Sequence, residues 1–296
     1  MVVAVLDVGS HTMRTLVASG GARDLALLHE ERAQLGLGAE IERRGRLSKA
    51  KLAETARHAA AQARSAERLG AERLAVVVTA PGRQAANAER LVEALRDATG
   101  VVPRLLSSEE EGCFAFHGAL AGAGSVPETV AVCDVGGGST ELVVGTASGE
   151  PAWLGCFELG AARLTARLIR DDPPGRAALE AVRAHVEASL QGFTPPLPMA
   201  ALAAGGTARA LRKLVGGSLG PDELAEAVRI CRKRSSDRIA KSFGVDCERA
   251  RTLAAGSVIL AAIQTRLFLP FQVARFGLRE GVALSLFAEM EEAAAA

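Results

Sequence analysis

The stretch that decides the fold is Asp7-Val8-Gly9-Ser10, and a longer version of it returns in the second half as Asp134-Val135-Gly136-Gly137-Gly138-Ser139-Thr140. Each copy follows a short apolar run typical of a buried strand, at 2–6 and 129–133, and a second such run follows each copy. Each copy is therefore predicted to lie at the tip of a β-hairpin. The recurrence in both halves points to an internal duplication.

The composition of these loops indicates their chemistry. Glycine has no Cβ, so its backbone N–H groups can come close to an anion. A carboxylate beside such a loop repels phosphate unless a divalent cation lies between them. An acidic residue next to a glycine loop therefore predicts a site for metal and phosphate, and two such loops predict a clamp. A single copy would be weak evidence, because Asp-Gly and Gly-Gly pairs mostly mark ordinary turns.

Composition excludes several classes of protein. The 296 residues are enough for two domains, and no run of apolar residues is long enough to span a membrane. The five cysteines are scattered without CxxC spacing, so we expect reduced thiols in a cytoplasmic protein. A net charge of +1, 3% aromatic residues and no tyrosine argue against nucleic-acid binding.

Periodicity predicts three strands and then alternating helices and strands in each half. The long helix 48–69 has Ser48 as its expected N-cap, and an acidic helix starts near Ser107 and runs to about 120. Other expected elements of the first half are strands 2–6, 14–18, 25–33, 74–78 and 101–106 and helix 86–98. The second half should have strands 129–133, 139–145, 151–157, 200–203 and 272–275 and helices 160–169, 174–190, 205 onward, 221–232, 235–243, 248–266 and 279–291.

This layout predicts an α/β fold made of two ribonuclease-H-like (actin-like) domains with an interdomain cleft. Glycines at 122 and 124 suggest the boundary, with domains at 1–122 and 123–296. The final helix, 280–296, can alternatively pack back on the first domain.

Seven segments of this sequence resemble the exopolyphosphatase and guanosine pentaphosphate phosphatase family of the actin-like superfamily. They are Asp7–Arg14, Thr79–Arg83, Ser108–Gly112, Asp134–Leu142, Leu159–Thr165, Gly205–Ala208 and Gly277–Gly281. The chain departs from the family pattern at His11 and Ala86. Because it ends at 296, it resembles the short, two-domain form, for which we expect no further C-terminal module.

The resemblance implies that Glu111 is the general base that activates water, with Glu110 as the neighbouring candidate. A phosphoanhydride is hydrolysed by a water that lies in line with the leaving oxygen and loses a proton as it attacks. The alternative is that the three glutamates at 109–111 only complement the dipole of the helix that they start.

Metal and phosphate ligands follow from the two loops and the resemblance. Asp134, Glu141 and Asp7 are expected to hold Mg²⁺, which Mn²⁺ could replace, although an aspartate at a strand end is often a turn former. The expected phosphate-binding residues are Gly9, Ser10, Arg14, Arg83, Gly136, Gly137, Gly138, Ser139, Thr140, Gly206, Thr207 and Arg279. These arginines could instead be solvated, as could the basic stretch 229–241, for which a channel for a long polyanion is an alternative.

The resulting hypothesis is an Mg²⁺-dependent exopolyphosphatase that removes terminal phosphate from inorganic polyphosphate by direct attack of water. A guanosine pentaphosphate 5′-phosphatase would use the same residues. A non-catalytic alarmone or nucleotide sensor and an actin-like kinase or ATPase are further alternatives. By analogy with the family we expect a homodimer, without a nucleic-acid or membrane partner.

Overall fold

The computed structural model describes residues 1–295 of the chain. They form two compact units. The first consists of Met1–Ala121 together with the segment that begins at Phe276, and the second is Gly122–Arg275. The second unit is thus shorter than the predicted span 123–296, because the last helix packs within the first unit. Within the described residues, no helix is long and apolar enough to cross a membrane.

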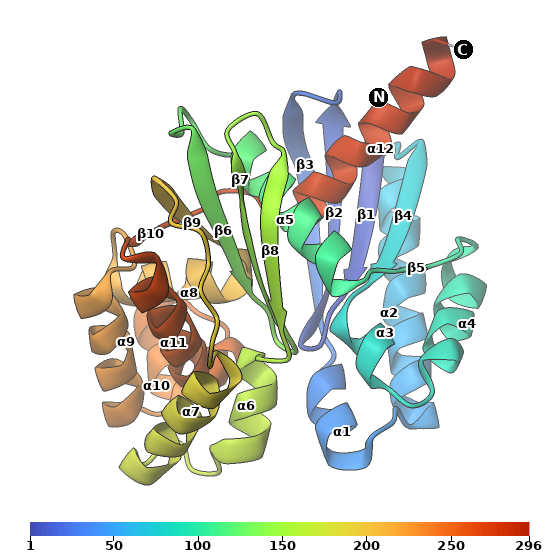
Figure 1. Cartoon of the computed structure of the whole chain (residues 1–296). Coiled ribbons are helices and arrows are strands. Elements are labelled where there is room, and N and C mark those ends of the chain that lie inside the picture. The colour runs from blue at the N-terminus through green and yellow to red at the C-terminus, as the bar shows by residue number, and fades with distance from the viewer. Residues whose placement is uncertain (296) are drawn as a thin grey trace. The chain divides into compact units, whose positions relative to one another are not determined.

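The first unit is built on a five-stranded sheet in the order β3-β2-β1-β4-β5. The first three strands are antiparallel neighbours, whereas β4 and β5 run parallel to β1 (Figure 1). Its elements are β1 (Val2–Val8), β2 (Thr12–Gly20), β3 (Leu25–Gln34), α1 (Leu37–Arg44), α2 (Lys49–Arg68), β4 (Arg73–Val78), α3 (Ala80–Gln84), α4 (Ala88–Thr99), β5 (Arg104–Leu105), α5 (Ser108–Ala121) and α12 (Leu278–Ala295).

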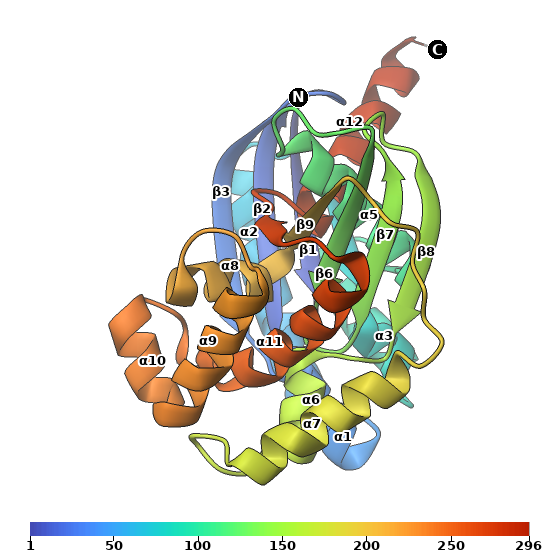
Figure 2. The same cartoon turned by 60° about the vertical axis from the view of Figure 1, so that its left-hand side comes forward.

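The second unit repeats this topology, with the strand order β10-β9-β6-β7-β8. Helices α8 and α11 pack against β6, and α9 and α10 pack on α11 (Figure 2). Its elements are β6 (Thr129–Val135), β7 (Thr140–Thr146), β8 (Pro151–Phe157), α6 (Ala161–Leu168), α7 (Arg176–Ser189), β9 (Ala200–Ala204), α8 (Gly205–Val215), α9 (Pro221–Lys233), α10 (Ser236–Phe243), α11 (Cys247–Leu267) and β10 (Phe271–Val273).

The predicted α/β duplication is confirmed by the matching sheets. Most predicted elements are present within a few residues, and the Ser48 hydroxyl caps α2 by accepting from the backbone N–H of Lys51. Helices α1 and α3 were not predicted. The segment of α1 has glycines at 36, 38 and 45, which indicate turns when read alone, but burial of Leu37 and Ile41 makes it a helix.

Strand β1 is buried on both faces, and this organises the first unit. Its alternate residues Leu6 and Val8 face one cluster of apolar side chains, whereas Val3 and Val5 face the opposite cluster. The second cluster also contains Phe287 of α12. The C-terminal helix therefore completes a core that the first 121 residues leave open on one side.

Helices α5 and α12 approach each other closely through two glycines. A Cβ on Gly118 would lie 1.9 Å from the carbonyl oxygen of Gly277, and a Cβ on Gly281 would lie 1.9 Å from that of Phe114. Both distances are far below a van der Waals contact, so any side chain at either position would push the helices apart.

We predict that Gly281→Ala lowers the free energy of unfolding by about 1–3 kcal/mol, the usual cost of overpacking. Urea unfolding followed by circular dichroism would measure it. Gly124→Ala is the matched control, since a Cβ at Gly124 has nothing within 4 Å and its φ is not positive. Equal stability of the two variants would contradict the close approach of α5 and α12.

Candidate functional site

The two hairpin tips have the same backbone geometry. The N–H of Gly9 donates to the carbonyl of Thr12 at 3.1 Å, and the N–H of Gly136 donates to the carbonyl of Ser139 at 2.9 Å. Each bond closes a two-residue tip. The strands run further than the sequence predicted, to Val8 and Val135, so Asp7 and Asp134 are the penultimate residues of β1 and β6.

The start of a helix holds each tip by its carbonyl groups. In the first unit, Gly38 N–H at the beginning of α1 donates to the Ser10 carbonyl at 2.8 Å. In the second unit, the N–H groups of Ala162 and Arg163 at the beginning of α6 both donate to the Gly137 carbonyl at 3.0 Å. These bonds use donors that a helix start leaves without intrahelical partners. They also turn the carbonyls of the tip toward the helix.

Cross-strand pairing sets the side chains beside each tip. Asp134 is the direct partner of Glu141, and at the equivalent place in the first hairpin Asp7 is the direct partner of Arg14. Direct partners have Cβ atoms about 5 Å apart. The second hairpin therefore brings two predicted metal ligands together, whereas the first places a predicted metal ligand beside a predicted phosphate ligand.

Gly205 packs directly against Asp134. It has φ of +80°, and a Cβ there would lie 2.2 Å from Oδ1 of Asp134. Glycine is therefore required at the start of α8, because of both the positive φ and the lack of room for a Cβ. The same first turn of α8 holds Thr207, which is fully buried and accepts a hydrogen bond from Arg249 of α11 at 3.2 Å.

Glu111 lies in the first turn of α5, is nearly buried, and is held by Arg83. The guanidinium donates to Oε2 of Glu111 at 2.9 Å and to the Leu106 carbonyl at 2.7 Å. Arg83 itself belongs to α3, which begins right after Thr79, and the Thr79 N–H donates to the Val8 carbonyl at the end of β1. Glu111 is thereby connected to the first hairpin through two elements of the same unit.

Glu110 has a different environment from Glu111. It forms a capping box with Ser107: the Ser107 hydroxyl accepts from Glu110 N–H at 3.1 Å, and Oε2 of Glu110 accepts from Ser107 N–H at 2.9 Å. Its Oε1 pairs with Arg104. Arg104 and the Ser107 backbone lower the pKa of Glu110 below its ordinary value. Of the two candidate bases, Glu110 therefore has one oxygen committed to the helix start and the other to Arg104.

Several predicted phosphate ligands make internal contacts. The Thr140 hydroxyl donates to the Leu159 carbonyl. Arg279 is only 5% exposed and pairs with Glu30 of β3 at 2.6 Å. Arg279 also lies in the same unit as Arg83. The reason is the return of α12 to the first unit.

The groups at both tips fit phosphate and a hard cation. Oγ of Ser10 is buried and has no hydrogen-bond partner among the described residues, as expected for a hydroxyl that awaits an external group. Glu141 is 2% exposed beside a second carboxylate, an arrangement that a bound cation would stabilise. Residues 1–295 contain no group of three or more acidic, His or Cys side chains that could hold a metal. Two carboxylates are nevertheless sufficient for Mg²⁺, which takes its other ligands from water and substrate.

The structure shows the surroundings of His11 and of the basic stretch 229–241, to which the sequence assigned no definite role. His11 Nε2 lies 2.8 Å from Nε2 of Gln34 in β3, which anchors its ring beside the first tip. The basic side chains of the stretch 229–241 are exposed, and Arg229 pairs with Glu226. This environment is that of a solvated helix face. The buried Arg249 was not singled out from the sequence, where nothing distinguishes it from the other arginines.

The comparison with protein families settles the class of the chain. The model of the Ppx/GppA phosphatase family matches residues 16–290. The chain belongs to the Ppx/GppA family. It is accordingly a phosphoanhydride hydrolase with the two-domain actin-like fold of that family.

Relatives and solved structures agree with this assignment. The Mycobacterium tuberculosis protein named exopolyphosphatase 1 is 29% identical, over 96% of this chain and 88% of that protein. The Aquifex aeolicus member of the Ppx/GppA family has a solved structure that is 26% identical, with a TM-score of 0.81 over 98% of both chains. A structure of an exopolyphosphatase from Cytophaga hutchinsonii is 16% identical, with a TM-score of 0.87 over 98% of both chains, and shows the shared fold.

Proposed function

We propose that this Ppx/GppA member is an exopolyphosphatase that hydrolyses the terminal phosphoanhydride bond of inorganic polyphosphate with Mg²⁺. The observation that carries the proposal is the Glu111 carboxylate, nearly buried and fixed by Arg83 on an element that directly follows β4. The elements that hold it lie at the carboxyl ends of the parallel strands β1 and β4, where α/β proteins usually bind ligands. The name of the mycobacterial relative supports the choice of substrate.

In this reaction Glu111 orients a water molecule and accepts one of its protons. The water oxygen forms a bond to the terminal phosphorus as the bond from that phosphorus to the bridging oxygen breaks. The bonding electron pair leaves with the shortened chain. The products are orthophosphate and a polyphosphate with one phosphate fewer.

The remaining residues bind and orient the substrate. Backbone N–H groups and hydroxyls of the two hairpin tips are suited to phosphate oxygens, and Ser10 Oγ is the clearest case. Asp134 and Glu141 would hold Mg²⁺, which supplies positive charge to the leaving oxygen. Asp7 as a further metal ligand, a homodimer and a cytoplasmic location remain predictions.

A guanosine pentaphosphate 5′-phosphatase is the second candidate, since the same residues would serve it. A guanine pocket needs groups that stack on the base or bind its edge. The single tryptophan, Trp153, is tilted against Phe193 with ring centroids 5.3 Å apart, and Phe157 meets the same ring at 4.6 Å. These aromatic rings pack on one another, which favours a substrate without a base.

A substrate panel tests this choice. We expect a higher kcat/KM for tripolyphosphate and longer polyphosphates than for guanosine pentaphosphate or ATP, measured as phosphate release by one preparation with Mg²⁺. A higher kcat/KM for the guanosine compound than for every polyphosphate would make the second candidate the correct function.

Glu111→Gln should lower kcat for polyphosphate by roughly 10²–10⁴, the usual loss when a general base is removed. The matched control is Glu110→Gln, because glutamine also satisfies the N3 position of a capping box and should leave kcat near the wild-type value. Both variants should keep the wild-type circular dichroism spectrum. A folded Glu111→Gln protein with normal turnover would remove this residue from the mechanism.

Phosphate release should stop in excess chelator and return with Mg²⁺ or Mn²⁺. In Asp134→Asn the concentration of Mg²⁺ needed for half-maximal rate should rise at least about tenfold, because the amide lacks the charge that holds a hard cation. Asp222→Asn, at an exposed position in the first turn of α9, is the control. Full activity in the chelator would refute the metal assignment.

A further inference from the structure

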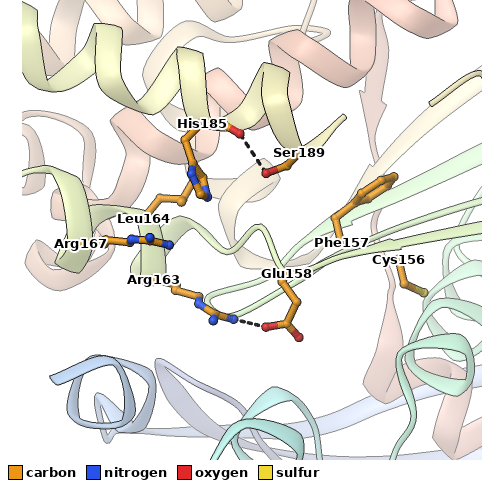
Figure 3. Close-up of a pocket in the computed structure, with 8 residues that line it drawn as sticks. All are labelled: Cys156, Phe157, Glu158, Arg163, Leu164, Arg167, His185 and Ser189. Carbon is orange, nitrogen blue, oxygen red and sulfur yellow. Dashed lines mark hydrogen bonds and ion pairs between the residues drawn. The ribbon is translucent and has the colours of Figure 1, made fainter. Parts of the chain in front are cut away.

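A pocket of about 390 Å³ opens within the second unit, between the end of β8, α6 and α7. Figure 3 shows His185 reaching down from α7 toward Leu164 and Arg167 of α6, with Arg163 further along α6 beside Glu158. Phe157 and Ser189 complete the wall. None of these residues belongs to the predicted site.

The charges in this pocket favour an anion. Arg163, Arg167 and His185 line it, and Glu158 is the one acidic side chain among the lining residues that the structure describes. Glu158 pairs with Arg163, and its side chain is 65% exposed, so this carboxylate lies at the rim. The Arg167 side chain is exposed within the pocket, and His185 is half-buried behind it.

Arg163 connects the pocket to the second hairpin tip. The backbone N–H of Arg163 donates to the carbonyl of Gly137 at 3.0 Å, while its side chain lines the pocket. Arg167 lies four residues on, hence on the same face of α6 and about one helical turn further from the tip. The two guanidinium groups thus form a basic ridge that leads away from the phosphate loop.

We propose that this pocket is a second subsite, which binds internal phosphate groups of a polyphosphate chain whose end lies at the Asp134 loop. The proposal rests on the proposed function. A linear polyanion carries a charge on every unit, so a substrate held at the tip can place further phosphates along the ridge. Guanidinium groups suit such a ligand because they donate two hydrogen bonds to one phosphate.

A purine base is a less suitable occupant. The edge of Phe157 or Phe193 meets the face of the other ring in a perpendicular contact, with an interplanar angle of 90°. Phe157 is thereby committed to the packing of β8 against Phe193. The charged side chains that line the pocket are mainly basic, and basic groups suit phosphate oxygens.

Chain length provides the test. In Arg167→Ala, KM for a long polyphosphate should rise about three- to tenfold, the range expected for losing a charge-assisted hydrogen bond partly screened by water. KM for tripolyphosphate and kcat for both substrates should stay within twofold of the wild type. Arg212→Ala, which removes an exposed arginine of α8 outside this pocket, is the matched control.

Glu158→Gln changes the same pocket in the opposite sense. Removing the acidic group should lower KM for the long chain, because it removes repulsion and releases Arg163 from its partner. If Arg167→Ala changed KM equally for tripolyphosphate and long polyphosphate, or changed neither KM, the subsite would be overturned.

Direct binding separates this inference from the proposed function. Fluorescence titration of the full-length Glu111→Gln protein with long polyphosphate, with and without Arg167→Ala, should show the same three- to tenfold weakening. If the wild-type protein hydrolyses no polyphosphate but Arg167→Ala weakens binding in this titration, the proposed function fails and the subsite stands. If polyphosphate is hydrolysed and Arg167→Ala changes neither KM nor binding, only the subsite fails.

Discussion

The hydrogen bonds from a helix start to the carbonyl groups of each hairpin tip are the constraint on which the candidate site depends. Gly38 of α1 holds the Ser10 carbonyl, and residues 162 and 163 of α6 hold that of Gly137. A glycine-rich tip without such contacts would be free to adopt many conformations, and binding would then have to offset that entropy. With its carbonyls held by a helix, the tip has a fixed shape before a ligand arrives, which is the usual requirement for electrostatic stabilisation of a reacting phosphate.

Groups of the protein itself also hold Glu111 in place. Adjacent glutamates in one helical turn have different partners: Glu110 closes a capping box and pairs with Arg104, whereas Glu111 turns inward to Arg83. The capping box fixes where α5 begins, and that start determines which of the three glutamates faces the interior. Arg83 then fixes the position of the inward carboxylate through its second bond, to the Leu106 carbonyl. The predicted base is therefore held by groups that do not need a substrate to be in place.

The two duplicated hairpins share the same backbone geometry, but the charged side chains beside their tips differ. The position that is Glu141 in the second hairpin is Arg14 in the first, and each is the cross-strand partner of an aspartate. One hairpin thus pairs two acids and suits a cation, while the other pairs an acid with a base and lies near the Glu111–Arg83 pair. The two units therefore place different charges at equivalent positions of their hairpins.

The sequence by itself determined the duplicated α/β architecture, the two hairpin tips and the capped starts of α2 and α5, because these depend on local periodicity, glycine and capping residues. It did not determine α1, because one glycine within this helix and one at each end indicate a loop until burial of Leu37 and Ile41 is counted. Nor did it determine the environment of Arg279, which pairs with Glu30 across 249 positions of sequence, or the partnership of Arg249 with Thr207. The sequence alone does not distinguish an arginine that binds a substrate from one that forms an internal ion pair. Only the tertiary structure decides between them, because burial and charge partners come from elements that are far apart along the chain.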